Sequence, residues 1–336
     1  MKLYRCARME GIAGLELREE PDLPSPGPHQ VLMKVNASSL NFRELLFMNG
    51  ALGDSLRPDF IPASDGAGTV VAVGSRVRRV KPGDRVVATF YDNWTGGTIP
   101  QHADTLGRGA IVEGMLRDRA LLSEEELVTI PDHLSDEEAA TLPCAALTAW
   151  NALCLHAPLL PGQSVVVQGT GGVSIFALQL ARFFGARVIA TSSSDAKLAR
   201  LAALGADATI NYRDTPQWAD AVLEFTGGQG ADLIVEVGGA ATFAQSVAAA
   251  RKGGRISVVG MLTGAPSPGD GFFMRGLSIA PIHVGSRQDF EAMNRAIDFH
   301  RLKPVIDSTF PFADVPDALR HLESQRHFGK IVIRHG

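Results

Sequence analysis

The chain has 336 residues, a length that corresponds to about two domains and can bury sizeable cores. Only 20% of the residues are charged and the formal net charge is −4, which excludes the strongly basic surface of a protein that binds nucleic acid or anionic membranes. A hydrophobic content of 45% and 35 glycines are typical of a compact α/β enzyme.

The sequence carries no signal for export or for membrane insertion. The segment Met1 to Arg8 is polar, and no apolar run reaches the ~18 residues of a membrane span. Three cysteines, Cys6, Cys144 and Cys154, have no metal-binding spacing and predict unpaired thiols in a reducing compartment. We therefore expect a cytoplasmic protein that acts on a small molecule and has no nucleic-acid or membrane partner.

The first part of the chain, residues 1 to about 123, is predicted to be β-rich. Several short strands with regular turns indicate a partly open barrel or sandwich. The turn before the last of them contains Pro82-Gly83-Asp84, which combines a fixed φ, a flexible residue and a side-chain acceptor. The expected elements are the strands 15–19, 31–37, 66–74 and 85–88 and a short helix, 39–49.

The segment from Tyr91 to Met115 is long and rich in glycine. Long loops in compact enzymes are often active-site loops, so one interpretation is a lid over a substrate cleft. A plain surface excursion is the alternative, and the sequence does not decide between them.

Residues 163–192 predict the first half of a dinucleotide-binding fold. The β-branched run Val165 to Val167 is typical of a buried strand, and Gly169-Thr170-Gly171-Gly172 forms a turn that brings backbone amides to a helix N-terminus. A helix from Val173 to Phe184 and a second strand from Arg187 to Thr191 follow, separated by a helix-ending Gly185. The third glycine of the usual fingerprint is replaced by Ser174, for which the sequence offers no functional account.

The remaining strands repeat this pattern. A strand from Asp232 ends at Gly238, and another from Arg255 ends at Gly260 and Met261. Because coenzyme loops gather at the carboxyl ends of parallel strands, these ends are expected beside the ribose and nicotinamide. The last strand is expected at 328–333 and contains Lys330, which we expect at the surface more than at the coenzyme.

The end of the second strand of this fold indicates the coenzyme. In NAD enzymes a carboxylate about 20 residues past the glycines accepts the ribose hydroxyls and repels a 2′-phosphate. Here that position is Ser192, followed by Ser193 and, further on, by Lys197. Hydroxyl donors and an ammonium suit a dianionic phosphate, so NADPH is favoured over NADH. Lys197 could instead be a solvated residue of a helix 195–204 that is capped by Asp195.

Several motifs in a fixed order carry a family resemblance: Asn41-Phe-Arg-Glu, Ser64-Asp-Gly-Ala-Gly-Thr-Val, Lys81-Pro-Gly-Asp-Arg-Val, Ala139 to Trp150, the Gly169 turn and Val284-Gly-Ser-Arg. Together they resemble the medium-chain dehydrogenase/reductase superfamily, in its zinc-independent quinone-oxidoreductase-like branch. The resemblance implies an α/β protein with a GroES-like β-rich catalytic domain, 1–145 and 287–336. It also implies an inserted Rossmann domain, a doubly wound parallel sheet, at 146–286.

The chain departs from the zinc alcohol dehydrogenases of this superfamily at their metal ligands. The matching positions hold Asn41, Ser64 with Asp65, and Cys144, and only the cysteine is a good ligand for zinc. The residues that relay protons in the zinc enzymes correspond to Arg43 and Leu46. We therefore predict no metal, with Cys144 and Cys154 as small packed residues and His102, His156 and His283 as lone histidines.

Without zinc, reduction is favoured over oxidation of a simple alcohol. We expect NADPH-dependent hydride transfer to a quinone, enone or enal, with Asn41, Arg43 and Asp65 as the groups that polarise the substrate. Asp65 could instead be a turn carboxylate and Arg43 a partner of the coenzyme pyrophosphate. Two other functions stay open: a zinc-independent carbonyl reductase or alcohol dehydrogenase, and a non-catalytic NADPH-binding or sensor protein.

The resemblance adds Thr148 beside the nicotinamide, Tyr212 near the adenosine, and a homodimer formed through the edge strand near 277–285. Pro281 is compatible with an edge strand. The complete set of expected coenzyme-binding residues is Thr148, Gly169, Thr170, Gly171, Gly172, Val173, Ser192, Ser193, Lys197, Tyr212, Gly238, Val259, Gly260, Met261, Gly285, Ser286 and Arg287.

Overall fold

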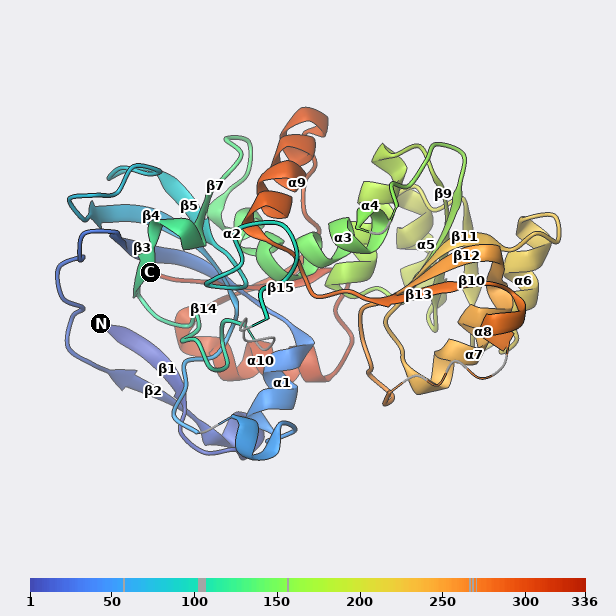
Figure 1. The fold of residues 1–336 in the computed structure, drawn as a ribbon. Coiled ribbons are helices and arrows are strands. Elements are labelled where there is room, and N and C mark those ends of the chain that lie inside the picture. The colour runs from blue at the N-terminus through green and yellow to red at the C-terminus, as the bar shows by residue number, and fades with distance from the viewer. Residues whose placement is uncertain (57, 102–106, 156, 266, 268, 270) are drawn as a thin grey trace. The chain divides into compact units, whose positions relative to one another are not determined.

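The structure is a computed structural model of the chain, and it describes every residue except 57, 102–106, 156, 266, 268 and 270. It divides into two compact units (Figure 1). Unit 1 comprises Met1–Leu147 and Val284–Gly336, and unit 2 comprises Thr148–His283. Unit 2 is therefore inserted in the sequence between the two segments that build unit 1.

Unit 1 is built on a seven-stranded sheet in which both chain segments take part. Its order is β14-β15-β3-β4-β5-β7, with β6 paired to β3. The pairs are antiparallel apart from β14 with β15. The strands are β3 (Gln30–Leu40), β4 (Asp65–Val73), β5 (Arg85–Ala88), β6 (Arg119–Ser123), β7 (Leu127–Thr129), β14 (Ile306–Pro311) and β15 (Lys330–Arg334).

Helix α1 (Phe42–Met48) is shorter than the predicted helix 39–49. Ser39 and Leu40 belong to β3, because β15 and β4 hold that strand extended from both sides. Asn41 then caps α1 in a capping box with Glu44. The Asn41 side chain faces the backbone N–H of Glu44, and the Glu44 carboxylate accepts from the backbone N–H of Asn41. Tertiary strand pairing thus overrides a local helical pattern.

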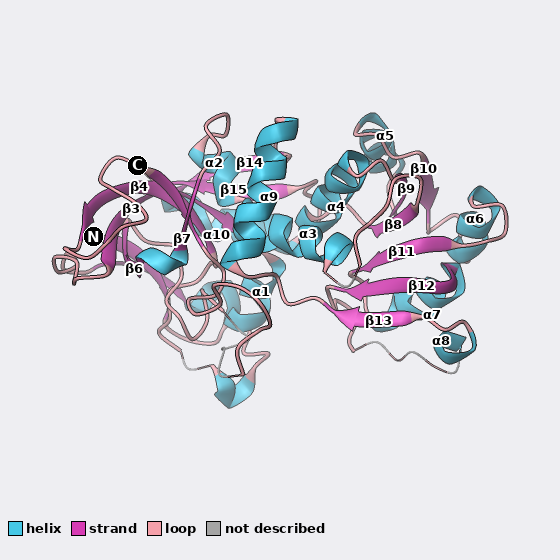
Figure 2. Ribbon diagram, turned by 45° about the horizontal axis from the view of Figure 1, so that its top comes forward, coloured by secondary structure: helices cyan, strands magenta, loops and turns pink. Residues whose placement is uncertain are grey.

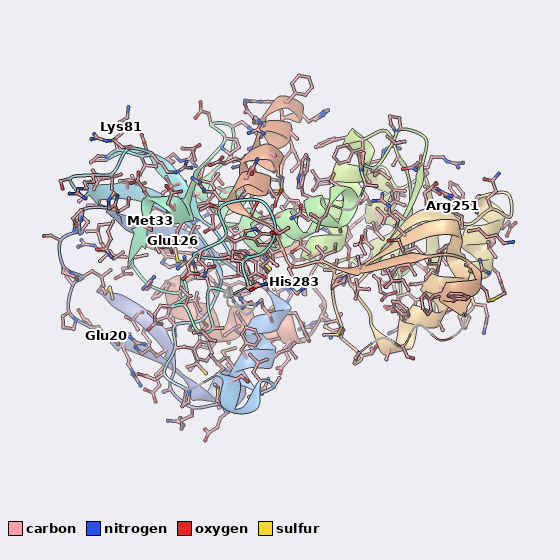
Figure 3. The ribbon with its side chains drawn as sticks, in the orientation of Figure 1. Glu20, Met33, Lys81, Glu126, Arg251 and His283 are labelled. Atoms are coloured by element: carbon pink, nitrogen blue, oxygen red, sulfur yellow. The ribbon has the colours of Figure 1, made fainter. Side chains whose placement is uncertain are left out.

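Hydrophobic clusters among the described residues stabilise unit 1. One lies on the sheet and includes Val35, Val86 and Met33. Of these, Figure 3 labels Met33. Another is packed between α1 and α10 (Val315–Glu323) and contains Met48 and Leu319. Unit 1 also contains α2 (Asp136–Ala140), a π-helical turn (Leu142–Ala146) and α9 (Arg287–His300).

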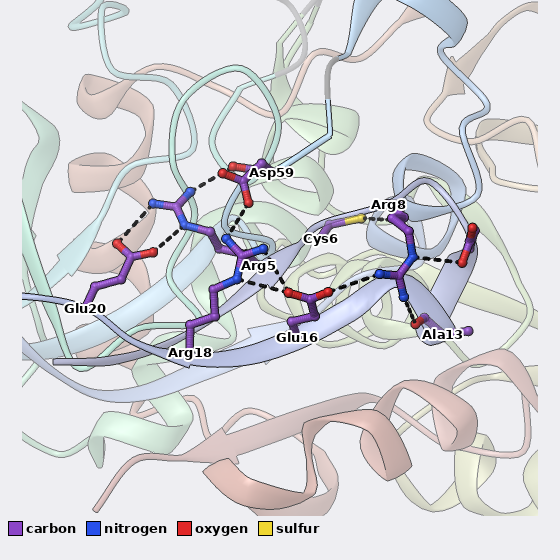
Figure 4. A network of polar contacts seen from close by, with 9 residues as sticks. Arg5, Cys6, Arg8, Ala13, Glu16, Arg18, Glu20 and Asp59 are labelled. Atoms are coloured by element: carbon purple, nitrogen blue, oxygen red, sulfur yellow. Dashed lines mark hydrogen bonds and ion pairs between the residues drawn. The ribbon is translucent and has the colours of Figure 1, made fainter.

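A separate ribbon of β1 (Lys2–Cys6) and β2 (Leu15–Glu19) has a charged side (Figure 4). Arg5 Nε donates to Glu20 Oε1 at 2.7 Å, and an Arg18 guanidinium nitrogen donates to Asp59 Oδ1 at 2.7 Å. Glu16 lies between Arg18 and Arg8 and accepts from both. These partly solvated pairs are a solvent-facing network, and such pairs contribute little stability each.

Unit 2 contains a six-stranded parallel sheet of order β10-β9-β8-β11-β12-β13 (Figure 2). The chain moves outward from β8 in one direction and then returns to pair β11 on its other side, so β8 and β11 flank a topological switch point. The strands are β8 (Ser164–Gln168), β9 (Arg187–Ser192), β10 (Ala208–Asn211), β11 (Ala231–Glu236), β12 (Ala250–Val258) and β13 (Ser278–Pro281). This arrangement confirms the predicted doubly wound sheet.

The helices of unit 2 cover the sheet. Val166, Ile189 and Ile234, from three neighbouring strands, form one hydrophobic cluster with Trp218 of α6 and Phe243 of α7. No described helix of the chain is long and apolar enough to cross a lipid bilayer. The helices are α3 (Leu147–Cys154), α4 (Gly172–Phe183), α5 (Asp195–Ala203), α6 (Trp218–Phe225), α7 (Ala240–Ala249) and α8 (Gly271–Met274).

Candidate active site

The glycine turn of unit 2 leaves open space at the N-terminus of α4. Gly169 has φ +72°, and a Cβ added at Gly169 or Gly171 would meet no atom within 4 Å. Gly171 is the N-cap and has no side chain to bond the first amides of the helix. Backbone N–H groups at such a position bind anions such as a pyrophosphate. The turn therefore fits the phosphates of a dinucleotide.

Ser174, which replaces the third glycine of the fingerprint, has a structural role in this turn. Its Oγ donates to the carbonyl oxygen of Gln168 at 2.6 Å, and the side chain is buried. The hydroxyl ties the first turn of α4 to the end of β8. Ser174, for which the sequence offered no function, thus links the helix that follows the glycine turn to the strand that precedes it.

Glu236, at the end of β11, organises the loop next to the switch point and was missed in the sequence. Its side chain is fully buried. The donors to its carboxylate are Gln168 Nε2 (2.8 Å), Thr242 Oγ1 (2.5 Å), Gly238 N (2.8 Å), Gly239 N (3.0 Å) and Ser246 Oγ. An acid at the end of an otherwise apolar run, separated from Gly238 and Gly239 only by Val237, was the available signal.

The end of β9 brings together residues expected at the adenosine. Ser192 is buried opposite Asn211 of β10, and its carbonyl accepts from Tyr212 N at 3.1 Å. Tyr212 is 42% exposed, and Lys197 is half-buried on α5. Strand register alone thus places Ser192 next to Tyr212.

The predicted cap of α5 is wrong. The helix begins at Asp195, so Ser194 is the N-cap residue, and no side-chain cap is formed. Asp195 Oδ1 instead accepts from Asn211 Nδ2 at 2.8 Å. The carboxylate is used to tie α5 to the end of β10, a contact that depends on the β9–β10 register.

The other expected coenzyme residues are distributed over both units. Gly260 follows β12 in close contact with Val237, whose carbonyl oxygen would lie 2.6 Å from an added Cβ. Val259 N donates to the Glu236 carbonyl, Met261 is 61% exposed, and Thr148 is buried in α3. In unit 1, Gly285 is buried, Ser286 caps α9 through Asp289, and Arg287 pairs with Glu125 at 2.9 Å.

In unit 1, three neighbouring strands bring polar residues together. In the antiparallel registers Ser39 of β3 lies opposite Asp65 of β4, and Leu40 lies opposite Ile331 of β15. Lys330, which precedes Ile331, therefore comes next to Asn41. The side chains of Ser39, Ser64, Asp65 and Lys330 are buried, whereas Asn41 keeps some exposure.

Lys330 is not the surface residue that the sequence predicted, because its side chain is only 2% exposed. Its ammonium donates to Leu40 O at 2.8 Å and to Asn41 Oδ1 at 2.6 Å, and it contacts Asp65 Oδ2 at 3.4 Å. An ammonium has three donors, and here all three face an acceptor.

Asp65 is the centre of this cluster. Its Oδ2 accepts from Ser39 Oγ and from Asn41 Nδ2, both at 2.9 Å, and its Oδ1 accepts from Ser64 Oγ at 2.7 Å. Asn41 Nδ2 also has a longer contact to Ser64 Oγ, at 3.4 Å. We call the group of Ser39, Asn41, Ser64, Asp65 and Lys330 the Asp65 cluster.

Arg43, the third expected polarising residue, takes a separate position. Its guanidinium lies 4.5 Å from the ring centre of Phe47 and 4.6 Å from that of Phe90, and it donates to the carbonyl oxygen of Arg108 at 2.7 Å. Arg43 thus attaches α1 to Arg108, within the 91–115 segment. The structure brings Asn41 and Asp65 together but not Arg43.

The described parts of the 91–115 segment are well anchored. Tyr91 and Trp94 are buried, and Arg108 is buried in an ion pair with Glu126, which Figure 3 labels. The backbone of Trp94 accepts from Arg287 N at 3.0 Å. Residues 102–106 lie outside the described residues, as do the expected lone histidines at 102 and 156, so the structure does not test the lid.

The donor set beside the Asp65 cluster does not fit a zinc ion. Of the residues at the zinc-ligand positions, only Cys144 has a side chain that zinc binds well, and a structural or catalytic site needs at least three such ligands. Asn41 and Ser64 offer an amide and a hydroxyl where zinc prefers thiolate or imidazole. Among the described residues, no three His, Cys, Asp or Glu side chains form a group that could hold a metal ion.

A buried carboxyl adjoins the cluster and gives a testable pH dependence. Burial raises the pKa of Glu44 from 4.5 to about 7, although the charges of Arg43 and Lys330 oppose the shift. The folded protein therefore holds a proton that the unfolded chain releases above pH 4.5, so stability present below pH 4.5 is lost as the pH rises to about 7. Between pH 4.5 and 7 the free energy of unfolding of Glu44→Gln is expected to fall by about 3 kcal/mol less than that of the wild type.

Urea unfolding measured from pH 4.5 to 7.5 checks this expectation. Glu323→Gln, at the exposed end of α10, is the matched control and should keep the wild-type pH dependence. An unchanged slope in Glu44→Gln would show that Glu44 ionises normally in the folded protein.

Comparisons with known proteins agree with this architecture. The profile of the zinc-binding dehydrogenase family matches residues 172–298, and that of the alcohol dehydrogenase GroES-like domain matches residues 27–132. A zinc-type alcohol dehydrogenase-like protein from Schizosaccharomyces pombe is 41% identical, over 94% of this chain and 94% of its own. A 2-methylene-furan-3-one reductase from Solanum lycopersicum is 33% identical, over 99% of this chain and 79% of its own.

A solved structure from Sinorhizobium meliloti 1021 is also similar, with a TM-score of 0.92 and 41% identity over 99% of this chain and 98% of that chain. The chain therefore belongs to the medium-chain dehydrogenase/reductase superfamily. It is an oxidoreductase with a GroES-like domain and an NAD(P)-binding Rossmann fold, as the sequence motifs predicted.

Proposed function

We propose that the protein is an NADPH-dependent reductase that delivers hydride to the electron-poor carbon of a quinone, enone or enal without zinc. One observation carries this proposal: Asn41, Ser64 and Asp65, at metal-ligand positions of the zinc enzymes, are instead hydrogen-bonded to one another and to Lys330. Such a site has no thiolate or imidazole set with which to bind a Lewis acid. Alcohol oxidation usually needs that acid, whereas reduction of an activated acceptor does not.

The residues at the end of β9 support NADPH as the coenzyme. Ser192 and Ser193 stand where an NAD enzyme has a carboxylate, and Tyr212 and Lys197 follow nearby. Hydroxyl, phenol and ammonium donors suit a 2′-phosphate, which a carboxylate would repel. When bound, NADPH supplies the hydride.

The substrate class is supported by chemistry and by one relative. The name of the tomato relative specifies a 2-methylene-furan-3-one as the compound that it reduces, and that compound is a ketone conjugated to a methylene carbon. In this chain, Asn41 is the partly exposed member of the Asp65 cluster, and its weakest contact is the 3.4 Å contact to Ser64. We assign its Nδ2 as the donor to the substrate oxygen, on which negative charge develops as hydride arrives.

Asn41→Ala is expected to lower kcat about 100-fold and to leave the Kd for NADPH unchanged, because the amide acts on the developing oxyanion. Steady-state kinetics with an enone and NADPH fluorescence titration measure the two quantities. Asn36→Ala, on β3, is the control and should keep the wild-type kcat. A wild-type kcat in Asn41→Ala removes Asn41 from the mechanism.

The direct test of the function is a matched set of substrates assayed with NADPH. An enone, the corresponding saturated ketone, the corresponding alcohol (with NADP⁺) and a quinone are compared, with the zinc content of the protein measured alongside. The proposal predicts turnover of the enone or quinone by metal-free protein. Preferential reduction of the ketone would establish a carbonyl reductase instead, and tight NADPH binding without turnover would establish a non-catalytic coenzyme-binding protein.

We also propose that two copies associate through β13. This strand is the edge of the six-stranded sheet of unit 2, and it carries the partly buried Ile279 and Ala280. Light scattering is expected to give the mass of a dimer, and Ala280→Arg should shift it to that of a monomer because a charged edge opposes strand pairing. A wild-type monomer would refute the proposal.

A further inference from the structure

Lys330 stands in the Asp65 cluster as a buried cation with every donor engaged. Two strand pairings bring it there: β15 with β3 places Lys330 beside Asn41, and β3 with β4 places Asp65 opposite Ser39. The ammonium then contacts Leu40 O at 2.8 Å, Asn41 Oδ1 at 2.6 Å and Asp65 Oδ2 at 3.4 Å. No N–H of this ammonium remains for a substrate, so Lys330 is a positioning residue.

The ammonium determines how the Asn41 amide is oriented. A lysine has only donors, so the amide must turn its oxygen toward Lys330. The NH₂ group consequently faces Asp65 and Ser64, at 2.9 and 3.4 Å. Lys330 thereby fixes which end of the Asn41 amide carries the donor.

The same ammonium lies among the positions that a metal ion would need. Asn41, Ser64 with Asp65, and Cys144 are the residues that match the zinc ligands of related enzymes, and Lys330 contacts two of them directly. Zinc would need oxygen or nitrogen ligands at about 2.0–2.2 Å, so it would have to approach the same oxygens that the ammonium occupies. Two cations competing for one buried carboxylate repel each other strongly.

We propose that the Lys330 ammonium permanently takes the place of a metal ion in this centre. It balances the charge of Asp65, orients Asn41 and keeps divalent cations out. This inference rests on the proposed zinc-independent function and names the residue responsible for it.

A double-mutant cycle tests the charge balance. Lys330→Met and Asp65→Asn are each expected to lower the melting temperature by about 5–10 °C, because each leaves a buried group without its partner. The double variant should lose no more than one single variant does, since both halves of the pair are gone. Losses that add in the double variant would overturn the proposal, because they would show that Lys330 contributes packing alone.

Two further variants keep this test decisive. Lys330→Arg retains the positive charge and should preserve the coupling with Asp65. Lys81→Met removes an exposed lysine in the turn before β5 (Figure 3) and should show no coupling with Asp65→Asn. Loss of coupling in Lys330→Arg, or equal coupling in Lys81→Met, would contradict the assignment.

Zinc uptake tests the exclusion of metal. Asn41→Cys and Ser64→His together supply, with Cys144, the three sulfur and nitrogen ligands of a zinc site. Equilibrium dialysis against Zn²⁺ followed by elemental analysis should find about one zinc per chain only when Lys330→Met is added. Equal zinc content with and without Lys330, whether high or absent, would overturn the proposal.

These measurements need neither coenzyme nor substrate, so they are independent of the proposed activity. A protein that shows the coupling and excludes zinc, yet reduces no enone or quinone, would refute the proposed function and leave the role of Lys330 intact.

Discussion

Ser192→Asp is expected to reverse the coenzyme preference, changing the ratio of kcat/KM for NADPH to that for NADH by about 1000-fold. A carboxylate at the end of β9 accepts the ribose hydroxyls of NADH. It also faces the 2′-phosphate of NADPH, and like charges in contact cost several kcal/mol, each 1.4 kcal/mol being tenfold. Steady-state kinetics with both coenzymes and one acceptor measure the ratio.

Two controls separate charge from the loss of a hydroxyl at this position. Ser192→Ala removes the donor without adding charge and should weaken NADPH only modestly. Lys197→Ala should raise the KM for NADPH and leave that for NADH near the wild-type value. An unchanged coenzyme ratio in Ser192→Asp would mean that the 2′-phosphate does not lie at the end of β9.

Glu236→Ala is expected to lower the free energy of unfolding by about 3–5 kcal/mol. The carboxylate accepts hydrogen bonds from three side chains and from the amides of Gly238 and Gly239, all near the switch point. Its removal leaves buried donors unsatisfied, which is costly in a low-dielectric interior. The 237–239 loop should loosen, so NADPH and NADH should both bind more weakly.

Chemical denaturation and coenzyme titration of the same samples check both parts of this expectation. Glu224→Ala, an exposed acid on α6, is the control and should change the unfolding free energy by no more than about 0.5 kcal/mol. If Glu236→Ala behaves like Glu224→Ala, the hydrogen-bond network around Glu236 does not stabilise unit 2.

The coenzyme fold was predictable because its evidence is local. A strand, a glycine turn, a helix and a second strand follow one another within residues 163–192, and each has its own periodicity or end signal. Gly185 is an example, because it adopts φ +72° just after α4, where a left-handed residue ends a helix. The order of motifs along the whole chain then predicted the GroES-like domain, which is unit 1.

The Asp65 cluster could be predicted only in part, because its members meet through long-range strand pairing. Asn41 and Asp65 were selected from motifs, but Lys330 comes from the far end of the sequence and joins them through the register of β15 on β3. All but the last residue of β15 are buried, so the strand has no alternation of buried and exposed residues from which the direction of the Lys330 side chain could be predicted. Ser39 was assigned to a helix for the same reason, since only its two strand neighbours keep it extended.

The closed hydrogen bonding around Asp65 also constrains how this protein can change over evolutionary time. A single substitution toward a metal ligand at Asn41 or Ser64 leaves Lys330 in place, and a single loss of Lys330 leaves a buried carboxylate without its cation. Each one-step path therefore passes through a destabilised protein before any metal can compensate. A metal-dependent chemistry therefore lies several simultaneous substitutions away from this sequence.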